Sequence, residues 1–286
     1  MAEIYLGTSG WSYKEWDGIF YPKRQKLKLS YYARYFKTVE IDSTFYAFPK
    51  EAMIKGCARY TPDDFVFTAK LLGLITHDKA LELEKGVKQD LEKFLYLMKP
   101  LINENKLGPL LIQLPPSFTY DNGYKKLGNF LETVPNDVRF AVEFRNKSWL
   151  GKEEVSELLK KHGVAQTIVD EPLLPPDTRV TTNFAFIRWH GHGERPWYNY
   201  RYSDKELEPW VNRINSISKK VDKIYGYLNN HYQGFAVENS LKMMDLLNLA
   251  TPKQVAMRKT VTKKIDNSTI NAALTQSCLP YSEFIS

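Results

Sequence analysis

Charged side chains follow short apolar runs in this chain, where they could perform acid–base or binding chemistry. Glu143 and Arg145 end one run, Asp170 ends the next, and Arg188 and His190 end a third. Residues two apart share one face of a strand, so Glu143 points with Arg145, and Arg188 with His190. Burying such charges is costly unless they pair or meet a ligand. The pattern therefore predicts a convergent binding site.

We take Glu143, Asp170 and His190 as the candidate catalytic residues. Glu143 and Asp170 end consecutive strands, so their carboxylates would lie roughly 5 to 9 Å apart, a range that suits paired acid–base chemistry. A carboxylate beside a cation keeps a low pKa, whereas a desolvated carboxylate has a raised pKa and can act as an acid. The sequence leaves open which residue takes which role. For Glu143 the alternative is an ion pair that holds Arg188 or Lys70 in place.

Other polar and aromatic residues after the apolar runs are candidate substrate-binding groups. Arginine holds phosphate in a bidentate fashion, and aromatic rings can stack on sugars or bases, so an anionic ligand is expected. Lys70 could instead form a Schiff base if its pKa were depressed, but the neighbouring arginines favour a binding role. The rings could alternatively pack as a lid. The predicted set is Trp11, Tyr13, Glu40, Lys70, His77, Gln113, Arg145, Arg188, Trp197, Asn229 and Asn230, with Arg195 as a further cation.

We predict neither a metal site nor a cofactor. Histidines and carboxylates near the strand ends could bind a divalent ion, but the chain has no His-Glu-x-x-His element and no Cys-x-x-Cys pair. The segment His190-Gly191-His192 is weak evidence for a metal. The segment Gly7-Thr8-Ser9-Gly10 lacks both the Lys-Ser/Thr of a phosphate-binding loop and the spacing of a dinucleotide fingerprint.

The elements that position these residues alternate between apolar runs and helical stripes. The clearest stripe begins at Val87 and continues through Met98, with shorter stripes at 127–134, 155–159, 207–214 and 241–247. Ser203 or Asp204 offers an N-cap to the stripe at 207–214. Residues 171–183 contain three prolines and no stripe, so a loop is expected in place of the sixth helix. The eight runs are residues 4–8, 38–42, 65–70, 110–114, 140–145, 165–170, 184–190 and 224–229.

This alternation predicts an α/β protein with a single (β/α)₈ barrel of the TIM type. Eight parallel strands satisfy all their edges only by closing on themselves, and in such barrels functional residues lie at the C-terminal ends of the strands. We assign residues 1–250 to the barrel. Residues 251–286 form a basic C-terminal extension that is either docked on the barrel or partly mobile.

Composition sets the expected partners and compartment. The net charge of +7 at pH 7 favours anionic small molecules or nucleic acid, although ordinary basic surfaces share such a balance. The two cysteines suggest no disulfide framework, and neither a secretory signal nor an apolar run of membrane-spanning length is evident. A cytoplasmic protein without a membrane partner is expected, and the oligomeric state stays open.

Several longer segments carry a family resemblance. They include GTSGWSYKEWDGIFYP at 7–22, YFKTVEIDSTFYAFP at 35–49, LITH at 74–77 and LGPLLIQLPPSF at 107–118. RFAVEFRNKSW at 139–149, the Asp170-Glu171-Pro172 corner, FIRWHG at 186–191 and YLNNHYQGFAVENS at 227–240 complete the set. Over residues 4–248 the chain resembles the DUF72 (YecE-like) family. The resemblance implies a TIM-like barrel with these motifs around its mouth and no established activity.

Two features depart from the family pattern. The family often has Asn where this chain has Asp42, and the basic extension has no obvious family counterpart.

We expect an enzyme that binds a phosphorylated or nucleic-acid-derived anion at the barrel mouth and uses carboxylate acid–base chemistry. One alternative is a non-catalytic nucleic-acid-binding module. The other is a metal-dependent phosphodiesterase or endonuclease-like hydrolase, a fold-level analogy.

Overall fold

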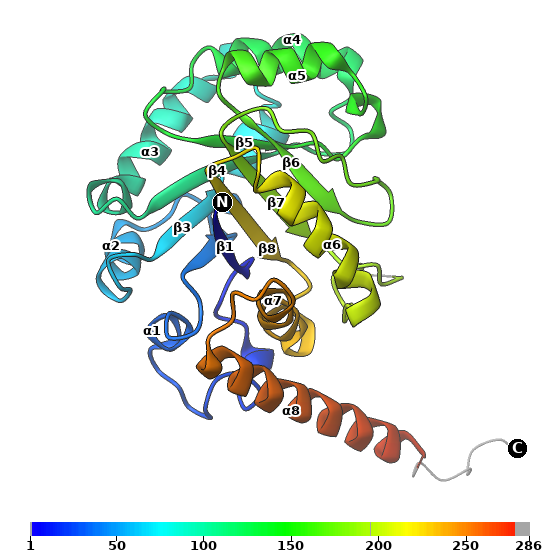
Figure 1. Cartoon of the computed structure of the whole chain (residues 1–286). Helices are drawn as coiled ribbons and strands as arrows, with labels where there is room; N and C mark the ends of the chain where they lie inside the picture. Colours follow the sequence, from blue (N-terminus) through cyan, green and yellow to red (C-terminus); the bar gives the residue numbers. More distant parts are fainter. Residues whose placement is uncertain (1, 195, 278–286) are drawn as a thin grey trace, which may run out of the picture.

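Eight parallel strands curve into a barrel in the computed structural model, which describes residues 2–194 and 196–277 (Figure 1). The hydrogen-bonded order is β1-β8-β7-β6-β5-β4-β3-β2. A parallel bridge between Ser9 and Glu40, with the Gly10 N–H donating to the Glu40 carbonyl at 2.8 Å, joins the β1 and β2 ends of that order. The strands are β1 (Glu3–Thr8), β2 (Thr38–Ile41), β3 (Val66–Lys70), β4 (Leu107–Gln113), β5 (Phe140–Glu143), β6 (Ala165–Asp170), β7 (Phe184–Trp189) and β8 (Lys223–Leu228).

Each apolar run predicted from the sequence coincides with one of these strands. The largest difference is at β4, which begins at Leu107 rather than at residue 110. Gly108 and Pro109, which disfavour a strand on propensity alone, are accommodated because β4 pairs with β3 through an irregular register at this point. The predicted (β/α)₈ fold is therefore confirmed.

Helices cover the outside of the barrel (Figure 1). The predicted stripes correspond to α3 to α7, and α6 begins with a capping box in which Ser203 and Glu206 satisfy each other's backbone N–H groups. Residues 171–183 contain no helix, as expected from the prolines of that segment. The helices are α1 (Lys28–Tyr32), α2 (Glu51–Arg59), α3 (Val87–Asn103), α4 (Tyr120–Leu131), α5 (Glu153–Lys161), α6 (Asp204–Ile217), α7 (Phe235–Leu246) and α8 (Pro252–Ser277).

Two apolar clusters lie on opposite faces of the strands. The larger one fills the space between strands and helices. The smaller one occupies the barrel interior and contains Tyr5, Leu111, Phe186 and Tyr225. Tyr227 also belongs to this cluster, and its hydroxyl shares a hydrogen bond of 2.7 Å with the Thr38 hydroxyl. Because side chains alternate along a strand, the interior cluster identifies which residues point inward at the C-terminal strand ends.

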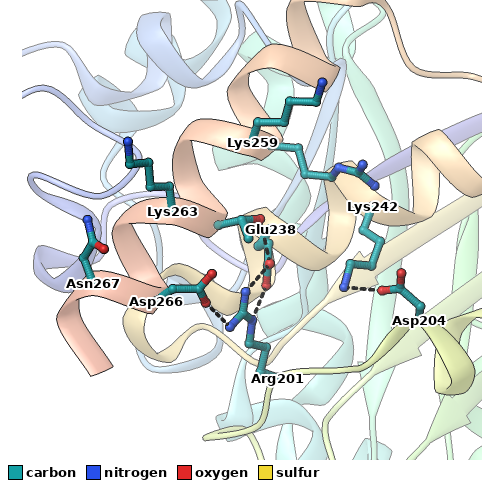
Figure 2. Close-up of a pocket in the computed structure, with 10 residues that line it drawn as sticks. Arg201, Asp204, Glu238, Lys242, Lys259, Lys263, Asp266 and Asn267 are labelled. Atoms are coloured by element: carbon teal, nitrogen blue, oxygen red, sulfur yellow. Dashed lines mark hydrogen bonds and ion pairs between the residues drawn. The ribbon is translucent and has the colours of Figure 1, made fainter. Parts of the chain in front are cut away.

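The C-terminal extension contributes a long helix, α8, whose first part lies beside α7 (Figure 1). Its buried residues Val261 and Ile265 join the larger apolar cluster. Polar contacts add to this: Arg201 pairs with Glu238 on α7 at 2.6 Å and with Asp266 on α8 at 2.7 Å (Figure 2). The first half of α8 thus contacts the barrel. Within the described residues, no helix is both long and apolar enough to cross a membrane.

Candidate functional site at the barrel mouth

A layer of polar side chains lies at the C-terminal ends of the strands, on the same strand faces as the interior cluster. We call it the polar layer; all eight strands or the residues directly after them contribute. Its members are Ser9, Glu40, Lys70, Gln113, Glu143, Arg145, Glu171, Arg188, His190 and Asn229.

Arg188 forms the floor of the polar layer. Its guanidinium donates to Glu40 and to Glu143, each at 2.8 Å, and to the Gln113 amide oxygen at 3.3 Å. Ser9 donates to the same Glu40 oxygen at 2.6 Å. The side chains of Arg188, Glu40 and Glu143 are 0 % exposed. Burial alone would lower the pKa of Arg188, but Glu143 and Glu40 raise it, so the guanidinium stays charged.

Two polar atoms in this floor have no partner among the described residues: the second carboxylate oxygen of Glu40 and the Nε of Arg188. Buried polar atoms are normally satisfied by protein groups, water or a ligand. The floor therefore has hydrogen-bonding capacity that the described protein atoms do not use.

Arg145 links the floor to the rim of the mouth. Its Nε donates to Glu143 at 2.5 Å, and its NH1 group pairs with Glu171. Its NH2 group lies 3.1 Å from His190 Nε2. The Arg145 side chain is 15 % exposed, so it can reach a ligand that the fully buried Arg188 cannot.

The charges around Arg145 set the protonation of its neighbours. Burial, followed by the field of Arg145, lowers the pKa of His190 to about 3, so this imidazole is neutral near pH 7. Burial raises the pKa of Glu143, but Arg145 and Arg188 outweigh that effect and hold it well below its usual range. Glu171 behaves oppositely, because burial dominates and raises its pKa. Glu143 is thus a fixed anion, whereas Glu171 is the acidic group better suited to donate a proton.

Lys70 ends β3 inside the mouth. Thr44 donates to the Lys70 carbonyl at 2.8 Å, which fixes the backbone at this strand end. Within the described residues its ammonium has no hydrogen bond or ion pair, and its Nζ lies 5.9 Å from the centre of the Phe45 ring. Burial and then the charge of Arg188 lower the pKa of Lys70 to about 8. Lys70 is half-buried and therefore reachable from solvent.

Aromatic and imidazole rings surround the polar layer on two sides. His77 packs edge-on against Phe45, with ring centres 4.9 Å apart, and burial lowers its pKa. On the other side, Tyr13 donates to the Ser9 carbonyl at 2.8 Å and lies 3.1 Å from an Asp42 carboxylate oxygen. The Tyr13 ring contacts His231, which in turn contacts Tyr198.

Two predicted site residues point away from the mouth. Asp170 accepts from Trp210 on α6 at 2.9 Å and lies 2.7 Å from His192 Nε2, which places it on the outer face of β6. Asn230 donates to the Tyr200 carbonyl and to Asn239 on α7, each at 2.8 Å. The structure therefore does not bring Asp170 beside Glu143 as the spacing suggested. Glu171, one residue later, is the β6 carboxylate that shares Arg145 with Glu143.

The structure places the two tryptophans predicted as substrate contacts as follows. The Trp11 ring lies edge-on to Phe67, with centres 6.5 Å apart, and packs on the cluster outside the strands. Trp197 is half-buried, and its carbonyl accepts from the Gly193 N–H at 3.1 Å. Arg195 lies outside the described residues.

Sequence reasoning omitted Ser9, Asp42, Glu171 and Tyr198 from the site. Ser9, Asp42 and Glu171 are polar residues at strand ends, so their residue type and position were enough to make them candidate site residues. For the two acids at the end of β6, the sequence did not indicate which one points into the barrel, because all six residues of β6 are buried and show no alternation. Among the described residues, no three or more His, Cys, Asp or Glu side chains are grouped to hold a metal ion.

Fold and site together define a class: a (β/α)₈ barrel with a buried, charge-paired layer at its C-terminal mouth. The model of the family described as "Protein of unknown function DUF72" matches residues 5–264. The chain belongs to this family. The match extends beyond residue 248 and includes the first half of α8, so this part of the extension does have a family counterpart.

Relatives and solved structures agree with that assignment. The chain is 28 % identical over 270 residues to the UPF0759 protein YunF of Bacillus subtilis, covering 86 % of this chain and 95 % of the relative. It is 31 % identical over 171 residues to the UPF0759 protein YecE of Escherichia coli, covering 58 % and 59 %. A crystal structure of a DUF72 family protein from Thermotoga maritima superimposes with a TM-score of 0.78 at 35 % identity, covering 86 % of this chain and 99 % of that one.

Proposed function

We propose that the barrel mouth binds a small phosphorylated or carboxylated molecule and acts on it as an enzyme by proton transfer. The observation that carries the proposal concerns two cations of the polar layer. The Lys70 ammonium has no hydrogen bond or ion pair among the described residues, and the Arg145 guanidinium is partly exposed. The carboxylates of Glu40 and Glu143 lie beneath them, fully buried and engaged by Arg188. A ligand entering from solvent therefore meets the cations of the polar layer before its anions.

The neutral groups of the layer fit the same ligand. Asn229 and Gln113 are half-buried amides that can donate to phosphate or hydroxyl oxygens. His190 lies between Asn229 at 3.0 Å and Arg145 at 3.1 Å, which fixes its ring in the mouth. For the acid–base step, Glu171 is the better proton donor because burial raises its pKa, while Glu143 stabilises the two arginines.

Calorimetric titration with sulfate, at constant ionic strength, tests the binding step. Sulfate is a suitable probe because it stays doubly charged between pH 6 and pH 10. We expect saturable binding to the wild-type protein, at least fivefold weaker binding to Lys70→Met, and no change in Lys88→Met. Lys88 is an exposed lysine on α3 and serves as the matched control.

Equal affinity in wild type and Lys70→Met would contradict the proposal. Salt-dependent binding of oligonucleotides without a Lys70 contribution would instead favour the nucleic-acid-binding alternative.

A further inference from the structure

We propose that Lys70 acts as a nucleophile toward an aldehyde or ketone, so that the ligand of this site is an anionic carbonyl compound held as an imine. The inference rests on the proposed function, because it assigns the reacting group within the same mouth. The geometric basis is the position of the Lys70 amine. This amine is half-buried, has no hydrogen bond or ion pair among the described residues, and lies at the C-terminal end of a barrel strand, where side chains from several strands converge.

The surroundings of Lys70 differ from those of a structural lysine. Lys106, for comparison, donates to the carbonyls of Ala58 and Thr61 at 2.6 and 3.0 Å, and pairs with Glu104. Lys70 makes none of these contacts, although carboxylates of the polar layer are close enough to influence its charge. A buried amine without partners is costly to maintain, and depressed basicity is what an imine-forming lysine needs.

Burial and the neighbouring Arg188 supply that depressed basicity. At pH 7 a lysine with a pKa of about 8 has roughly two orders of magnitude more neutral amine than one with the ordinary value of 10.5. The guanidinium of Arg188 is itself fixed by Glu40 and Glu143, so its charge near Lys70 is permanent.

The chemistry balances without any further reactant. Lys70 gives its ammonium proton to solvent, and the free electron pair of Nζ forms a C–N bond to the carbonyl carbon. The carbonyl oxygen takes up a proton and the nitrogen releases one to solvent, which gives a neutral carbinolamine. A second proton then converts that hydroxyl into water, which leaves as the nitrogen electron pair forms the C=N bond. The product is a protonated imine plus water. Glu171 is positioned in the same layer as the group that can supply the second proton.

Reductive trapping with two small aldehydes tests the inference. Glyoxylate is an aldehyde with a carboxylate, and glycolaldehyde is an uncharged aldehyde of similar size. Each is incubated with the wild-type protein at pH 7 and then reduced with sodium borohydride, which adds hydride to an imine carbon and makes the adduct permanent. Peptide mass spectrometry then compares modification of Lys70 with that of exposed Lys88.

We expect Lys70 to be modified at least tenfold faster than Lys88 by both aldehydes, with a further several-fold preference for glyoxylate. Modification of Lys70 at the rate of Lys88 or slower overturns the imine inference, because this comparison is made in unaltered protein. Fast modification of Lys70 by both aldehydes without preference for glyoxylate would support imine formation and contradict the proposed anion site. If sulfate binding depends on Lys70 but the aldehydes do not modify Lys70, the proposed anion site is supported and the imine inference is overturned.

Discussion

Arg188 on β7 joins Glu40 on β2 to Glu143 on β5, with both distances at 2.8 Å, although neither strand is a neighbour of β7 in the sheet. The guanidinium therefore spans the barrel interior. This ionic contact lies directly below the mouth residues that solvent can reach, and it fixes the ends of three strands relative to one another.

Replacement of Arg188 by Met should destabilise the fold strongly. It would remove the arginine partner of the fully buried Glu40 and one of the two arginine partners of the fully buried Glu143, and breaking a buried pair in this way costs about 3–5 kcal/mol. Urea unfolding followed by circular dichroism measures the loss. Adding Glu40→Gln to the variant should recover part of it, and a loss below about 1 kcal/mol would show that the floor is not a structural element.

Replacement of Lys70 by Met should make the protein more stable at pH 7. Because the pKa of Lys70 is lowered to about 8 in the folded protein, the charged ammonium disfavours folding below pH 8, and this penalty disappears as the pH rises toward 10.5. We expect a gain of about 2 kcal/mol at pH 7 that shrinks by pH 10. Chemical unfolding at pH 7 and pH 10 measures this gain in stability, with Lys88→Met as the comparison. A gain that is the same at both pH values would contradict the prediction.

Sulfate affinity should fall as the pH rises through about 8. Lys70 is cationic below its pKa and neutral above it, while the lowered pKa values of His77 and His190 keep those rings neutral over the same range. Loss of one nearby charge weakens binding by about 1 kcal/mol, or roughly fivefold. Titrations at pH 7 and 9 should show this fall in wild type and a flat profile in Lys70→Met.

The two acidic residues at the end of β6 should behave differently toward an anion. Glu171→Gln removes a carboxylate that competes for Arg145, so sulfate should bind several-fold more tightly. Asp170→Asn alters a contact with Trp210 and His192 on the outer face and should change sulfate affinity by less than about twofold. The reverse ranking in the same titration would place Asp170, not Glu171, in the mouth.

Docking of α8 should depend on Arg201. Glu238 is buried beneath it (Figure 2). Arg201→Met would leave that carboxylate with Thr262 as its remaining partner among the described residues. We expect a loss of about 2 kcal/mol and faster tryptic cleavage within α8, where Lys259 and Lys263 are exposed. Asp204→Asn, which alters the ion pair between the exposed Asp204 carboxylate and Lys242, is the control and should leave cleavage unchanged.

The sequence by itself determined the barrel and most members of the polar layer. Strands buried on both faces appear in the sequence as apolar runs, and charged residues follow or end most of these runs. Type and position therefore identified Glu40, Lys70, Glu143, Arg145, Arg188 and His190. Prolines after Asp170 likewise indicated the missing helix, because proline lacks the N–H that a helix interior requires.

Only the tertiary structure decided which of those residues face one another. Asp170 and Glu171 are adjacent acids in the sequence, and a buried strand gives no periodic signal to tell the inward one from the outward one. Closure of the barrel set that direction, and it brought Arg188 to Glu40 from 148 residues away. The absence of an ion pair to Lys70 among the described residues was decided in the same way, because charge pairing depends on distances in space that the order of residues does not contain.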